Sequence, residues 1–191
     1  MNSNNIIRSI IEKYNPASEK EEKDKIAFLQ LINNFDDILT RNNTIGHITA
    51  SGFVINEAKD KALMLKHNIM KAYLFPGGHA DGETDLLGVA IREVEEETGI
   101  KVAPYQDDPI AINVGPVPRH IKKGQIVPPH LHFDIIYLLM AQNRDMSQIH
   151  TLETENSDVA WFNLEETYGI KVSEYVDETT KEIVSRIRKL K

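Results

Sequence analysis

The stretch that decides the fold lies between Gly77 and Ile100 and reads GGHADGETDLLGVAIREVEEETGI. It opens with a Gly-Gly turn, and a long helix fits residues 85–98 behind that turn. Gly99 is well placed to end this helix, because glycine readily adopts the left-handed conformation that helix ends require. The apolar stripe that we expect to face the core consists of Leu87, Ile91 and Val94.

The end of this helix carries a dense run of carboxylates, namely Glu93, Glu95, Glu96 and Glu97. On an ideal helix Glu93 and Glu97 lie about 40° apart, Glu96 lies about 60° to the other side of Glu93, and Glu95 points roughly away. Exposed like charges repel at such spacings, whereas a magnesium ion prefers carboxylate oxygens and shares its remaining positions with water and substrate phosphates. A solvated acidic face would explain a bare glutamate run, but the turn and the flanking residues favour a metal site.

This stretch resembles the Nudix box, which reads Gly, five residues, Glu, seven residues, then Arg-Glu-apolar-x-Glu-Glu-x-Gly-apolar. The second half matches throughout from Arg92 to Ile100, and Gly78 lies at the family's distance before Arg92. The first half departs from the pattern. The box glutamate would fall at Thr84, whereas Glu83 comes one residue early, and this leaves the role of Glu83 open.

The resemblance implies an α/β fold, the Nudix-type α/β/α sandwich around a mixed sheet, and a hydrolase that cuts a diphosphate bond. By resemblance, Glu93, Glu96 and Glu97 bind Mg²⁺ or Mn²⁺, with the carbonyl of Gly78 as a further ligand. Arg92 would hold a glutamate in place by a charge-assisted hydrogen bond. The metal would lower the pKa of a water that attacks phosphorus, and a nearby carboxylate or histidine would take the proton.

A second polar cluster lies at the start of the clearest strand, LHFDIIYLLMA, over residues 131–141. His130, His132 and Asp134 alternate, so their side chains share one face. One interpretation is functional: these residues would supply a proton acceptor, a phosphate contact or an extra metal ligand. The other interpretation, the solvated end of a strand, is about equally supported. An independent zinc site is less favoured than either. We assign His132 to catalysis and His130 to substrate binding, and interpret His47 and Ser51 as structural.

Further substrate contacts are expected near the box and in a proline-rich segment over residues 116–129, which we expect to be a loop. His79 directly follows the Gly-Gly turn, beside the expected metals. Arg119, Lys122 and Lys123 concentrate positive charge in an acidic protein and would clamp phosphates. A solvated loop is an equally supported interpretation of these three residues.

The remaining sequence predicts helices at both ends and strands between them. Residues 1–43 carry apolar residues at helical spacing and form the expected helical N-terminal extension, whereas residues 44–191 form the expected Nudix hydrolase domain. Ser18 and Glu21 are spaced as a capping box. Strands are expected over residues 47–55, 61–67, 109–114 and 158–164, and a final helix over residues 177–190.

Composition narrows the function classes. The chain has 191 residues, is 41% apolar, lacks cysteine and carries a formal charge of −7. The missing cysteine excludes disulfides, thiolate metal sites and cysteine nucleophiles. The negative charge disfavours a long nucleic acid as partner. No signal peptide and no membrane-length apolar run is found. We therefore expect a cytoplasmic protein with a small phosphorylated substrate and no membrane partner. A homodimer would be common for the family.

Two other functions stay open. The chain would be a non-catalytic Nudix-like ligand-sensing module if its metal cluster were inactive, although such modules often lose box glutamates. Isopentenyl-diphosphate isomerase shares the fold, but its mechanism uses a cysteine that this chain lacks. The leaving group is also open among nucleoside triphosphates, sugar nucleotides, ADP-ribose and dinucleoside polyphosphates. Pro116, sixteen residues after the box, is a weak indication of ADP-ribose.

Overall fold

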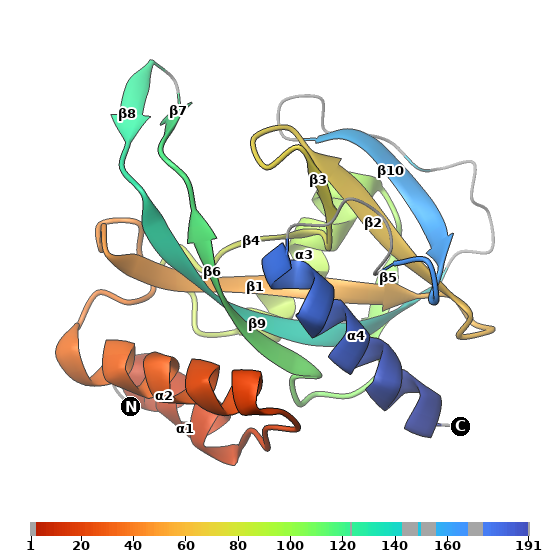
Figure 1. Cartoon of the computed structure of the whole chain (residues 1–191), viewed down its shortest axis with the longest axis horizontal. Helices are drawn as coiled ribbons and strands as arrows, with labels where there is room; N and C mark the ends of the chain where they lie inside the picture. The colour runs from red at the N-terminus through yellow and green to blue at the C-terminus, as the bar shows by residue number, and fades with distance from the viewer. Residues whose placement is uncertain (1–2, 123, 143–148, 150–155, 168–173, 191) are drawn as a thin grey trace.

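The computed structural model describes residues 3–122, 124–142, 149, 156–167 and 174–190 (Figure 1). Its centre is an eight-stranded mixed sheet in the order β10-β2-β1-β9-β5, with β3 beside β2, β4 beside β1 and β6 beside β9. The strands are β1 (Gly46–Ile55), β2 (Lys61–His67), β3 (Ala72–Leu74), β4 (Gly77–His79), β5 (Val102–Pro104), β6 (Ala111–Val117), β9 (His130–Ala141) and β10 (Asn156–Asn163). The helices are α1 (Ser3–Lys13), α2 (Glu19–Asn34), α3 (Leu86–Thr98) and α4 (Glu174–Lys189).

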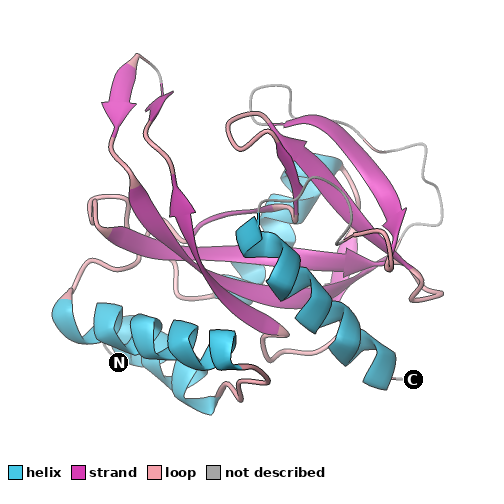
Figure 2. Ribbon diagram, viewed as in Figure 1, coloured by secondary structure: helices cyan, strands magenta, loops and turns pink. Residues whose placement is uncertain are grey.

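The parallel pair β1 and β9 forms the middle of the sheet, from Gly46 opposite Leu131 to Ile55 opposite Met140. Among the described residues, every other strand pair of this sheet is antiparallel. Figure 2 shows α4 crossing in front of the sheet, α3 behind it, and α1 and α2 side by side below. The prediction of an α/β sandwich around a mixed sheet is therefore confirmed, with a helical segment at the N-terminus.

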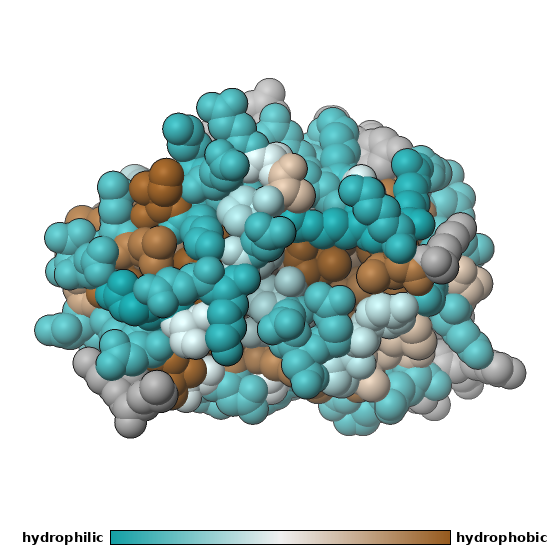
Figure 3. All heavy atoms as spheres, turned by 90° about the horizontal axis from the view of Figure 1, so that it is seen from below, coloured by the Kyte–Doolittle hydropathy of each residue, from teal (hydrophilic) through white to brown (hydrophobic). Residues whose placement is uncertain are grey.

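Alternate residues of β9 enter two separate cores. Ile135 and Leu139 pack in the cluster that includes α3, α1 and α2, whereas Ile136 and Leu138 pack in the cluster that includes α4. This alternation is the side-chain period of a strand covered by helices on both faces. Seen from below, the surface is mostly hydrophilic, and apolar residues show between the polar ones (Figure 3).

Helix α3 begins and ends where its sequence predicts. Asp85 caps its start, with the side chain accepting a hydrogen bond from the Gly88 N–H, and Gly99 ends it at a φ of 73°. The expected core stripe was partly wrong. Val94 is buried, but Leu87 and Ile91 are only half-buried, and the fully buried apolar side chains on this helix are those of Leu86, Val89, Ala90 and Val94. The helix lies close to the sheet, because a Cβ on Gly52 would come 2.5 Å from Val94 Cγ2.

The N-terminal helices join the main core through an aromatic contact and a buried ion pair. The Phe28 ring of α2 meets Phe133 of β9 edge-on, with ring centroids 5.2 Å apart. Ser18 caps α2 by accepting from the Glu21 N–H, as predicted. The Glu21 carboxylate is fully buried and binds Arg186 of α4 at 2.5 Å.

The proline-rich segment expected to be a loop instead contains a small hairpin, and that expectation was wrong. Strands β7 (His120–Lys122) and β8 (Gln125–Val127) pair with Ile121 opposite Ile126, and Gly124 takes a φ of 77° in the turn. The hairpin projects from the sheet at the start of β9 (Figure 1). Among the described residues, no helix is long and apolar enough to cross a bilayer.

Candidate functional site

The Gly-Gly turn and the carboxylate helix meet at β4. A Cβ on Gly78 would come 2.5 Å from Oε2 and 2.6 Å from Oε1 of Glu93, so the space that any other side chain needs is filled by that carboxylate. The backbone N–H of Gly77 donates to Glu97 Oε2 at 2.9 Å, and Glu97 is only 3% exposed. Two of the predicted metal ligands therefore lie against the Gly77–Gly78 turn.

The other two glutamates of the run differ in their surroundings. Glu96 is exposed, whereas Glu95 is half-buried and pairs with Lys101 at 2.5 Å. The ion pair separates Glu95 from Glu93 and Glu97 at the Gly77–Gly78 turn, and metal binding by Glu96 stays a prediction. The arrangement provides hard oxygen donors of the kind that magnesium prefers.

The partner of Arg92 is the glutamate whose role was open. Arg92 Nη2 donates to Glu83 Oε1 at 2.8 Å, and Nη1 donates to Oε2 at 3.2 Å, which is a two-pronged ion pair. The hydrogen bond that Arg92 donates to Glu83, together with the charges of Glu83, Glu93 and Glu96, raises the pKa of Arg92 against a smaller effect of burial. The pair ties the loop that follows Gly78 to the helix that carries the ligands.

A cluster of four histidines lies across β4 from these glutamates. Residues directly opposite in a sheet share a face, and the register pairs His47 with His132 and Thr49 with His79. Neighbouring residues Gly78 and His79 point to opposite faces, so His79 lies on the side away from Glu93. The ring of His47 lies 5.1 Å from His79, 4.9 Å from His130 and 5.1 Å from His132, measured between centroids.

Sequence reasoning found His130 and His132 as one cluster but placed His47 and His79 elsewhere. The missed signal is the register of the parallel pair β1 and β9, which brings together residues far apart in the sequence. Burial is the largest cause that lowers the pKa of His79 to about 3 and that of His132 to about 2, and nearby positive groups such as Arg41 and the other histidines add to it. Burial also lowers the pKa of His47. These three imidazoles are neutral at neutral pH.

Asp134 extends the polar face beyond the histidines. It accepts hydrogen bonds from Thr49 Oγ1 and Ser51 Oγ, both at 2.9 Å. Burial raises the pKa of Asp134 to about 6, and the two hydroxyl hydrogen bonds oppose that rise. Ser51 holds this carboxyl group, which agrees with its structural interpretation.

The predicted basic residues lie at the hairpin. Arg119 and Lys122 are exposed, and Lys123 lies outside the described residues. The charge of Lys122 contributes to the low pKa of His79, so Lys122 is within electrostatic reach of the histidine cluster. His120 of the same hairpin lies 6.3 Å from His130 between ring centroids.

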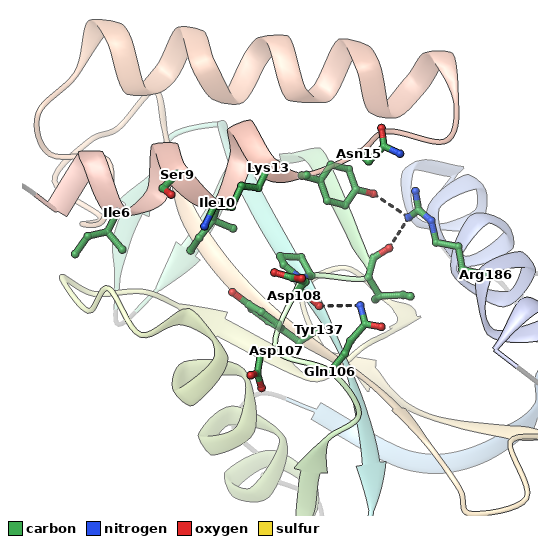
Figure 4. Close-up of a pocket in the computed structure, with 13 residues that line it drawn as sticks. Ile6, Ser9, Ile10, Lys13, Asn15, Gln106, Asp107, Asp108, Tyr137 and Arg186 are labelled. Carbon is green, nitrogen blue, oxygen red and sulfur yellow. Dashed lines mark hydrogen bonds between the residues drawn. The ribbon is translucent and has the colours of Figure 1, made fainter.

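A half-open hollow of about 580 Å³ lies elsewhere, between α1 and the segment before β6 (Figure 4). Tyr137 and Arg186 line it together with apolar residues of α1, and Arg186 donates to the Ile110 carbonyl at its edge. Within the described part of the chain, no residue predicted to bind metal or substrate lines this hollow.

Comparisons with known proteins agree with the fold. The model of the NUDIX domain matches residues 46–186. A "Probable DHNTP pyrophosphohydrolase" from Lactococcus lactis subsp. cremoris (strain MG1363) is 29% identical over 150 residues, which is 78% of this chain and 82% of that protein. A hydrolase of the NUDIX family from Clostridium perfringens aligns with a TM-score of 0.55 at 21% identity, over 74% of this chain and 97% of that one. An Ap4A hydrolase from C. elegans aligns with a TM-score of 0.53 at 19% identity, over 74% and 98% of the two chains.

The chain belongs to the Nudix family. These comparisons also confirm the predicted class of enzyme, a Nudix pyrophosphohydrolase. Members of this family act on small phosphorylated substrates and generally use a divalent metal.

Proposed function

We propose that this protein hydrolyses a diphosphate bond in a nucleoside diphosphate linked to another moiety, as in ADP-ribose, a sugar nucleotide or a nucleoside triphosphate. Mg²⁺ would be the cofactor, and Mn²⁺ would replace it. The observation that carries the proposal is the placement of Glu93 and Glu97 against the Gly77–Gly78 turn. The named substrate of the L. lactis relative, DHNTP, belongs in the first set of compounds to be tested.

The residues present fit a hard divalent cation. Glu93, Glu96 and Glu97 offer carboxylate oxygens, and the missing side chain of Gly78 leaves the room that Glu93 occupies. When bound, the metal supplies charge neutralisation at phosphate oxygens and a water of lowered pKa. Glu97 is oriented by the Gly77 N–H, and Arg92 acts as a positioning residue that holds the loop through Glu83.

His132 is disfavoured as the proton acceptor, and a nearby carboxylate is the alternative that the family resemblance offers. A group with a pKa near the working pH is the efficient base, and burial lowers the pKa of His132 to about 2. His132 also shares the face of the sheet that points away from Glu93. The catalytic role of His132 stays a prediction, and both its low pKa and its place on the sheet disfavour it.

Substrate contacts are proposed at the hairpin. Arg119 and Lys122 are exposed, and their charges would hold phosphates together with Lys123. The roles of His79 and His130 as substrate contacts stay predictions, because both rings pack against His47 on the face away from α3.

The test is a screen of ADP-ribose, sugar nucleotides, nucleoside triphosphates, dinucleoside polyphosphates and the DHNTP of the relative, with release of phosphate, pyrophosphate or AMP as the readout. We expect turnover of at least one compound with Mg²⁺ or Mn²⁺ and none after exhaustive chelation. Full turnover in the presence of excess chelator would contradict the metal-dependent part of the proposal. Tight binding of one compound with no turnover would instead favour the ligand-sensing module.

Isopentenyl-diphosphate isomerase remains the less favoured alternative, because the chain has no cysteine. A homodimer, a cytoplasmic location and the absence of a long nucleic-acid partner also stay predictions. Analytical ultracentrifugation and a filter-binding assay with nucleic acid test the first and the last of them.

A further inference from the structure

We infer that the histidines at the start of β9 form a second metal site, which binds a zinc-class divalent cation through His47, His130 and His132. One ring nitrogen from each of these residues lies within 4.8 Å of those of the other two. The ring of His79 packs against those of His47 and His132, but His79 is not one of the three ligands. The site is distinct from the glutamate site, because the two groups lie on opposite faces of β4.

The hydrogen bonds of the outer nitrogens leave lone pairs pointing inward. His47 Nδ1 lies 3.1 Å from the Asn43 carbonyl, and His130 Nδ1 lies 2.9 Å from the Pro128 carbonyl. A carbonyl only accepts, so each Nδ1 donates there, and Nε2 is the atom of each ring that can offer a lone pair to a metal. Metal-bound histidines typically donate their second N–H to such a carbonyl, which fixes the ring for coordination.

The inner nitrogens of His130 and His132 are spaced as two ligands of one ion. His130 Nε2 and His132 Nε2 lie 3.3 Å apart. Two nitrogens bound to tetrahedral zinc at the usual bond length are separated by about 3.3–3.4 Å. A hydrogen bond between the two rings would account for this pair alone. That hydrogen bond would not explain the buried His47 Nε2, which has no hydrogen-bond partner among the described residues.

The donor set selects the class of ligand. Imidazole nitrogen suits zinc and similar transition metals, whereas magnesium and calcium prefer oxygen. A phosphate is the rival ligand, since Arg41 and Lys122 place positive charge near His79. However, a phosphate needs N–H donors, and the Nδ1–H groups of His47 and His130 are already directed at the carbonyls of Asn43 and Pro128. Arg41 is also paired with Asp81. The observations therefore favour a cation.

The site would fasten two strands at one end of the sheet. His47 lies in β1, and His130 and His132 begin β9, directly after the β7–β8 hairpin. Metal at this point would hold the base of the hairpin. We therefore expect zinc, but not magnesium, to raise the melting temperature of the metal-free protein.

The experiment measures metal content. The full chain is stripped with chelator, given one equivalent of zinc in excess Mg²⁺, and passed through gel filtration before elemental analysis. We expect about one zinc per chain, as for a structural site. His130→Gln and His132→Gln should each weaken zinc affinity by about tenfold or more. His120→Gln, which removes a neighbouring histidine outside the set, and Glu93→Gln, in the other site, should retain the metal.

X-ray absorption of the zinc-loaded wild-type protein gives a second readout that does not depend on the variants folding. It should show nitrogen ligands at about 2.0–2.1 Å with the scattering of imidazole rings. The inference is overturned if zinc washes out in Mg²⁺, if the ligands are oxygens, or if Glu93→Gln loses the zinc while His130→Gln keeps it. Binding of inorganic phosphate, rather than zinc, that His130→Gln abolishes would also overturn it.

Discussion

At the scale of single residues, Gly78 has a role that only glycine can fill. Its missing side chain is replaced by the Glu93 carboxylate, which a Cβ would meet at 2.5 Å. We predict that Gly78→Ala displaces this carboxylate and lowers turnover by about 10²-fold, the usual cost of misplacing a catalytic group by about 1 Å. Steady-state kinetics at saturating metal give the measurement.

A matched control is Gly82→Asn in the same loop. Gly82 has a φ of 95°, where asparagine is better tolerated than most residues, and its missing Cβ would have no neighbour within 4 Å. This variant should keep most of the activity. If Gly78→Ala were as active as Gly82→Asn, the contact with Glu93 would have no catalytic importance.

At the scale of elements, the buried ion pair joins α2 to α4. Burial alone would raise the pKa of Glu21, but hydrogen bonds from Arg186, Tyr14 and the Ala17 N–H outweigh it and lower the pKa below its ordinary value. A lowered folded-state pKa contributes stability above the unfolded pKa of about 4.3, and this stability is lost as the pH falls through the folded-state pKa.

We predict that Glu21→Gln destabilises the fold by about 3–5 kcal/mol near neutral pH, because it leaves Arg186 without its buried counter-charge. The loss should shrink as the pH falls below about 4, where the parent also loses the ion pair. Urea melts between pH 3 and pH 7 give the comparison. Exposed Glu22→Gln, one residue further along α2, should cost no more than about 1 kcal/mol. Equal losses at every pH would contradict this account of the pair.

The hairpin gives a third prediction. Replacing Arg119 and Lys122 with Gln removes two exposed charges near the histidine face, so KM should rise and its dependence on salt should weaken. Replacing Lys23 of α2 and Lys189 of α4, both exposed, removes the same charge elsewhere and should leave KM unchanged. Identical KM values for the two double variants across ionic strengths would assign these hairpin residues to a solvated surface.

Local signals allowed the best predictions. The ends of α3 could be predicted because Asp85 and Gly99 are capping residues with their own short-range chemistry. The hairpin could not, because four prolines obscured the short strands around Gly124. The buried stripe of α3 was misjudged because its phase depends on how closely Gly52 lets the helix approach the sheet.

At the scale of the whole molecule, the sheet register decides what sequence reasoning misses. His47 and His132 are directly opposite in the parallel pair, but only the pairing of distant strands reveals it. Likewise, residues 1–43 look like a separate extension in the sequence, whereas Phe28 packs in the same core as Phe133. The boundary at residue 43 stays a proposal, and the shared core argues that both parts unfold together.

The central claim is that one face of α3 binds the catalytic metal, and paired metal titrations of Glu97→Gln and Glu95→Gln test it most directly. Glu97 lies buried against Gly77, whereas Glu95 pairs with Lys101 at the surface.

We predict that Glu97→Gln lowers turnover by at least about 100-fold and weakens the response to Mg²⁺, since outer-sphere changes alone cost up to that much. Its metal-free stability should stay equal or rise slightly, because repulsion from Glu93 and Glu96 is relieved. Glu95→Gln should change stability by no more than about 0.5 kcal/mol and leave turnover near that of the parent. Equal damage to turnover in both variants would contradict the assignment of the metal ligands.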